Sequence, residues 1–123
     1  MTRNHREFTV GPDLFGATWQ VEFVWLQTAI SIRHCDAVDV KFFLTSDTGK
    51  REKVVALMNK DLLELCRRED RPLTDAWCMK LAGQHVRHMA ATGEDMEKTL
   101  VTVTPGQLES YAAQLDEAAT AAR

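Results

Sequence analysis

Two histidines in a segment with helical periodicity are the residues best suited to metal chemistry. His85 and His88 lie three residues apart, a spacing at which two imidazoles on one helix can bind the same ion. Cys78 precedes His85 by seven residues, roughly 10 Å along a helix axis. Zinc–ligand bonds are only about 2 Å long, so Cys78 is too distant to complete that set. His85 and His88 are therefore metal-ligand candidates, and the alternative is that both are structural histidines.

A second group with possible chemistry is His34-Cys35-Asp36, in which a thiol lies beside an imidazole. Such a pair could give a thiolate nucleophile. However, adjacent residues of a strand point to opposite faces, and the segment is predicted at an exposed hairpin tip. A turn in which Asp36 binds local amides is the favoured interpretation.

Other catalytic signatures are missing from the sequence. No serine has the flanking glycines of a nucleophile elbow, and the six glycines are too scattered for a phosphate-binding loop. The sequence therefore favours a noncatalytic protein without a cofactor. A small metal-dependent protein or enzyme that uses His85 and His88 is the alternative.

Basic residues form two short runs that could contact phosphate groups. Lys50, Arg51 and Lys53 make up the first run, and Arg67 and Arg68 begin the second. Acidic residues interrupt both, and the net charge is −3. Because nonspecific nucleic-acid binding relies on a positive field, salt-bridged surface is the favoured interpretation and nucleic-acid association a second alternative.

Cysteine content and hydropathy both bear on location. The chain has three cysteines, an odd number whose spacing is not that of a disulfide framework. No run of about 18 apolar residues predicts a membrane span. The segment 1–7 is polar and lacks the apolar core of a secretory signal. We expect a cytoplasmic protein with reduced thiols and no membrane contact.

Alternating apolar residues predict a strand that begins near residue 17. In a regular strand, Trp19, Phe23 and Trp25 fall on one face, whereas Val24 and Leu26 fall on the other. A hairpin loop over residues 35–37 would follow.

That loop sets the predicted pairing of the first hairpin. It puts Ile32 opposite Val40 and Ile30 opposite Phe42, and it avoids pairing either isoleucine with a charged residue. A second turn over residues 46–50 leads into the next strand.

Helix signals dominate the second half of the chain. Asn59 is a predicted N-cap for a short helix that runs to Arg68 and carries an apolar stripe. Thr74 is a predicted N-cap for a helix of about 18 residues, and Thr104 followed by Pro105 predicts the last helix. The helix after Thr74 has a predicted apolar face of six residues: Cys78, Leu81, Ala82, His85, Val86 and Met89. A strand over residues 99–103 separates these two helices, and its position in the sheet stays open.

These elements predict an α+β fold in the order β-β-β-β-α-α-β-α. It is a mostly antiparallel meander of about four to five strands with three helices mainly on one face. Residues 1–16 form an N-terminal arm with a short strand, and residues 17–123 form one α+β domain.

The sheet has apolar residues on both faces, because Phe43 and Val54 fall on the face opposite Phe42 and Val55. This is more apolar surface than three helices on one face can cover. The sequence therefore predicts a noncatalytic protein–protein interaction module or small subunit that self-associates through this two-sided sheet. The partner is another protein or a second copy. The predicted contact residues are Trp19, Val24, Trp25, Leu26, Phe43 and Val54.

Overall fold

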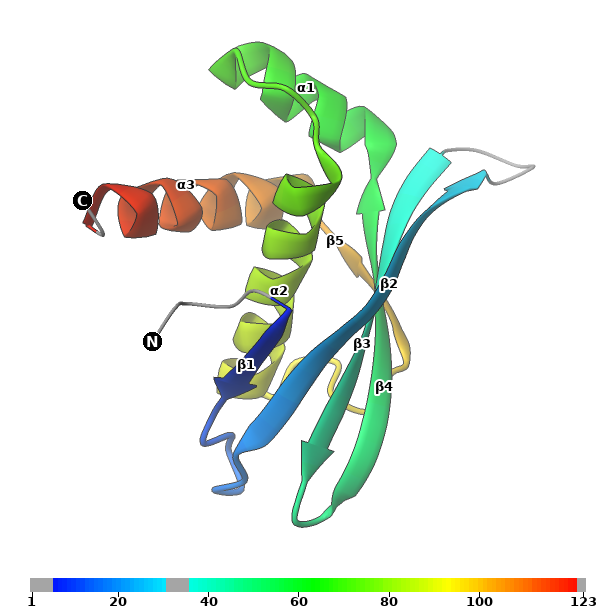
Figure 1. Ribbon diagram of the computed structural model, residues 1–123, viewed down its shortest axis with the longest axis vertical. Coiled ribbons are helices and arrows are strands. Elements are labelled where there is room, and N and C mark those ends of the chain that lie inside the picture. The colour runs from blue at the N-terminus through cyan, green and yellow to red at the C-terminus, as the bar shows by residue number, and fades with distance from the viewer. Residues whose placement is uncertain (1–5, 31–35, 122–123) are drawn as a thin grey trace.

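The protein has an α+β fold with the predicted element order (Figure 1). The structure is a computed structural model and describes residues 6–30 and 36–121. Within those ranges the strands are β1 (Glu7–Val10), β2 (Trp19–Ile30), β3 (Asp36–Ser46), β4 (Gly49–Met58) and β5 (Leu100–Val103). The helices are α1 (Asn59–Glu69), α2 (Asp75–Thr92) and α3 (Pro105–Ala121).

The sheet is mixed and mostly antiparallel. Strands β1 to β4 form an antiparallel meander in chain order, and β5 lies beside β4 and parallel to it. Val54 faces Leu100 in this last pair, and the Val54 N–H donates to the Thr99 carbonyl at 2.7 Å. A parallel neighbour requires a long crossover connection, which α1 and α2 supply. The sequence left this position open because period-two alternation does not identify a strand's neighbour.

The core lies between the sheet and the helices, all of which are on one side of the sheet (Figure 1). Val40, Phe42 and Val55 face the helices and are fully buried. The predicted apolar face of α2 is confirmed, because its six residues are all buried: Cys78, Leu81, Ala82, His85, Val86 and Met89.

Side-chain caps begin the two long helices. Thr74 Oγ1 accepts from the Trp77 N–H at 3.2 Å, as the sequence predicted. Thr104 Oγ1 accepts from the Gln107 N–H at 3.2 Å, and Gln107 Oε1 accepts from the Thr104 N–H at 3.0 Å. Asn59, the predicted cap of the first helix, is instead its first residue. Local capping chemistry thus fixes where α2 and α3 start.

The predicted pairing of the first hairpin is wrong. Thr28 lies opposite Val38 and Leu26 opposite Val40, and residues 36 and 37 belong to β3 rather than to the loop. Ile32 and Cys35 lie outside the described residues. The observed and predicted registers differ by an even number of residues, so each strand keeps the same faces in both. Face matching alone therefore could not choose between them.

A β-bulge in β2 changes which residues face the helices. Phe23 lies opposite Phe42 and Trp25 opposite Lys41, so Val24 is an extra residue. The extra residue reverses the alternation, and Trp25 falls on the face away from Phe23. Phe23 shares a face with Trp19 as predicted, whereas the prediction that Trp25 also shares it is wrong.

Candidate functional site

The sheet face away from the helices carries an apolar band that we call the outer band: Trp25, Phe43, Val54 and Leu100. Trp25, Lys41, Val54 and Leu100 lie directly opposite one another across β2, β3, β4 and β5. Directly opposed residues point to the same face of a sheet. Phe43 is two residues from Lys41 on β3 and shares that face.

Lysine side chains cover part of the outer band. The Lys41 ammonium lies 5.9 Å from the Trp25 ring centroid and 5.3 Å from that of Phe43. The Lys50 ammonium lies 3.9 Å from the Phe43 centroid. Such cations are attracted to ring faces while their stems shield apolar surface. Trp25 and Phe43 are therefore half-buried although they lie on the open face.

No helix in the described ranges packs over this face, because all three lie on the other side of the sheet (Figure 1). Leu100, on the edge strand, is 63% exposed. Leu100 is not among the predicted contact residues, because sequence alternation does not show which strand lies beside β5.

Three of the six predicted contact residues lie on the outer face, and the other three do not. Trp25, Phe43 and Val54 share the outer face. Trp19 is buried and its Nε1–H donates to Asp13 Oδ2 at 2.9 Å, so a partner cannot reach it in this fold. Leu26 faces the helix side and packs against the core. Val24 is the half-buried extra residue of the bulge.

The two candidate metal ligands each have a side-chain partner. His85 is buried, and its Nδ1 is 2.7 Å from the Tyr111 hydroxyl oxygen. His88 Nε2 is 2.6 Å from Glu94 Oε2. The two imidazoles are stacked, with their centroids 5.9 Å apart and an angle of 24° between their planes. Within residues 6–30 and 36–121, no three His, Cys, Asp or Glu side chains are grouped to hold a metal ion.

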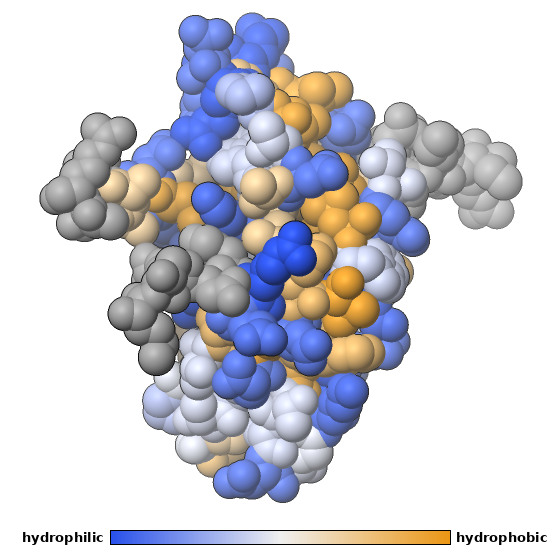
Figure 2. All heavy atoms as spheres, in the orientation of Figure 1, coloured by the Kyte–Doolittle hydropathy of each residue, from blue (hydrophilic) through white to orange (hydrophobic). Residues whose placement is uncertain are grey.

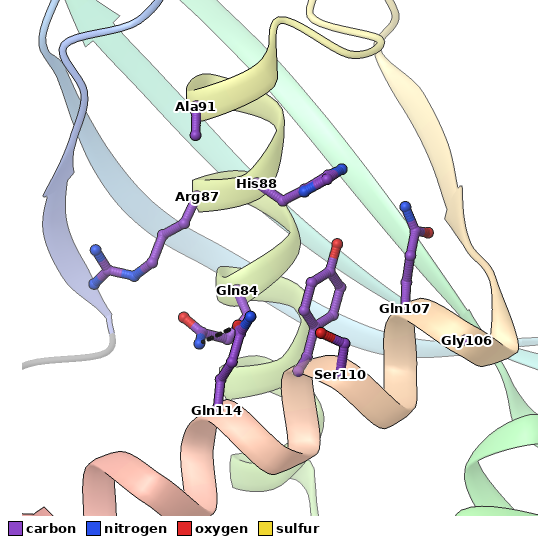
Figure 3. Close-up of a pocket in the computed structure, with 9 residues that line it drawn as sticks. Gln84, Arg87, His88, Ala91, Gly106, Gln107, Ser110 and Gln114 are labelled. Atoms are coloured by element: carbon purple, nitrogen blue, oxygen red, sulfur yellow. Dashed lines mark hydrogen bonds between the residues drawn. The ribbon is translucent and has the colours of Figure 1, made fainter.

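A polar groove of about 470 Å³ lies between α2 and α3, beside these histidines (Figure 3). Its lining includes Gln84, His88, Gln107, Ser110 and Gln114. Gln84 Nε2 donates to Gln114 Oε1 at 3.1 Å across the groove. The groove therefore offers several side chains that can form hydrogen bonds.

The two basic runs have different surroundings in the fold. Lys53 is buried, where its ammonium donates to the Met96 and Lys98 carbonyls, and burial lowers its pKa. Arg67 pairs with Glu64 at 2.8 Å, and Arg68 pairs with Glu109 at 2.5 Å. The burial of Lys53 could not be predicted from sequence, since lysine side chains are normally exposed.

Two of the three cysteines lie in the core. Burial raises the pKa of Cys78 to about 12 and also raises the pKa of Cys66. His34 and Cys35 lie outside the described residues.

We expect Cys78 to resist iodoacetamide at pH 8 in the folded protein and to react fully in urea, because the thiolate is the nucleophile. Peptide mass spectrometry measures this, and rapid modification under native conditions would contradict the burial.

Comparison with known proteins supplies no family. No protein-family model matches the sequence, and neither a curated protein nor a solved structure is significantly similar to it. Among the described residues, no helix is long and apolar enough to cross a membrane.

Proposed function

We propose that this protein is a noncatalytic interaction module that self-associates through its sheet. The observation that carries the proposal is an apolar outer band with no described helix over it. A contiguous apolar patch rimmed by charged residues is typical of a protein contact surface. Lys50 and Glu52 lie at the border of the band, whereas Lys41 lies between Trp25 and Val54, 3.5 Å from Glu52.

Charges of both signs around the band favour a second copy as the partner. In a two-fold contact the same patch meets itself, so it must be self-complementary. Lys41 and Lys50 can then meet Glu22 and Glu52, which share their face. We place the module in the cytoplasm, where the buried thiols of Cys66 and Cys78 would stay reduced.

The alternatives receive less support from the geometry. A metal bound by His85 and His88 would have no third His, Cys, Asp or Glu ligand grouped with them among the described residues. Association with nucleic acid through Arg67 and Arg68 would have to break two ion pairs.

Trp25 is the residue at which the proposal is tested, because it lies at one end of the outer band on the long strand β2. We expect Trp25→Glu to weaken self-association about 100-fold, since aromatic side chains dominate interface energies and both copies lose theirs. Light scattering over a concentration series measures the change.

Leu63→Glu is the matched control, because Leu63 is a 51% exposed apolar residue on α1, away from the sheet. This variant should keep the wild-type mass. A single-chain mass for the wild type at tens of micromolar would contradict the proposal. Self-association of Trp25→Glu as strong as that of the wild type would also contradict it.

A further inference from the structure

Among the described residues, the far half of β2 has a neighbouring strand on one side only. β1 pairs only with the segment from Trp19 to Glu22, and the Phe23 N–H donates to the Arg6 carbonyl at 2.7 Å. Beyond Phe23, the segment Val24–Ile30 pairs with β3 on one side. On its other side there is no strand among residues 6–30 and 36–121. Figure 1 shows β2 continuing past the end of β1.

This edge segment lacks the features that normally protect an open edge. Its sequence, VWLQTAI, contains no charged residue, proline or glycine. Exposed edge strands usually contain lysine or proline or are very short, because a row of unpaired amides and carbonyls can pair with other strands. Gln27 and Thr28 are exposed, and hydrophobic residues reach the surface over the middle of β2 (Figure 2). An edge of this kind is suited to pairing with another strand.

We infer that the edge pairs with the same segment of a second copy, so that β2 of each chain joins the two sheets. The inference rests on the proposed self-association and names its geometry. An antiparallel pair around a two-fold axis at Gln27 sets Leu26 of one chain opposite Thr28 of the other. Because the segment has no charge, the two-fold axis brings no like charges together.

Edge pairing also explains the position of Trp25. This residue is two positions from Gln27 and shares its outer face. The outer faces of the two sheets then lie side by side across the junction, with Trp25 of each copy close to it.

The test places a charge at the two-fold axis. Gln27→Lys and Gln27→Glu should each self-associate about 100-fold more weakly, because like charges become directly opposed and desolvated. An equimolar mixture of the two should regain the two-chain mass, since Lys then faces Glu. Gln20→Lys is the control on the same strand and face, opposite Thr9 of β1, and should keep the wild-type mass.

The outcomes separate this inference from the proposed function. A two-chain mass for Gln27→Lys alone overturns edge pairing. If adding Phe43→Glu to the Gln27→Lys variant then gives a single-chain mass, the copies pack face to face and the proposed function stands. A single-chain mass for the wild type overturns both.

The test must also distinguish a second copy from the segment 1–5 of the same chain as the occupant of the edge. Continuing the β1–β2 register would bring residue 2 opposite Gln27. In the double variant Thr2→Cys/Gln27→Cys we expect a disulfide between Cys side chains at position 27 of two chains. A disulfide within one chain, identified by peptide mass spectrometry, would overturn the inference.

Discussion

Lowering the pH from 7 to 4 is expected to remove about 3 kcal/mol of folding free energy through His85 alone. The side chain is 2% exposed, and burial lowers the pKa of His85 to about 4, with a smaller contribution from His88. Tyr111 faces its ring, and Glu94 and Asp95 oppose the shift in part.

The direction follows from comparing the folded and unfolded states. An unfolded histidine has a pKa near 6.5, so the unfolded chain binds the proton more readily between about pH 6.5 and 4. The contribution of His85 to the free energy of unfolding is therefore fully present above that window and is lost as the pH decreases through it.

Urea unfolding at pH 7, 6, 5 and 4 measures this effect. His85→Gln should lose most of the pH dependence in this window, because glutamine does not titrate. His88→Gln is the control, since His88 is partly exposed and its removal leaves the buried imidazole in place. Equal pH profiles for the wild type and His85→Gln would show that another group is responsible.

Neighbouring phenylalanines should differ strongly in their contribution to stability. Phe42→Ala is expected to cost about 4 kcal/mol, because the buried ring leaves a cavity between Phe8 and Phe23, whose rings it meets edge-on at 6.3 and 6.2 Å. Phe43→Ala should cost only about 1 kcal/mol, since that half-buried ring contacts lysines on the open face.

The two alanine variants serve as each other's control, because they make the same change one residue apart. Urea midpoints with equal slopes give the comparison. Equal losses, or a larger loss at Phe43, would mean that another segment covers the outer face.

Part of the candidate site could be predicted from sequence. Period-two alternation correctly placed Phe43 and Val54 on the face opposite Phe42 and Val55. It failed at Trp25, because one extra residue at Val24 reverses the alternation and no residue type marks the bulge. The open edge of β2 was also hidden, since it depends on how far β1 extends beside β2.

The sequence by itself determined the fold class, the element order, the starts of α2 and α3 and the buried face of α2. These features depend on residues close in the chain, such as Thr74 with Trp77 and Thr104 with Gln107. Only the tertiary structure decided the β2–β3 register, the place of β5 and the burial of Lys53. Each of these depends on contacts between residues distant in sequence, and several pairings satisfy the same local pattern until packing selects one.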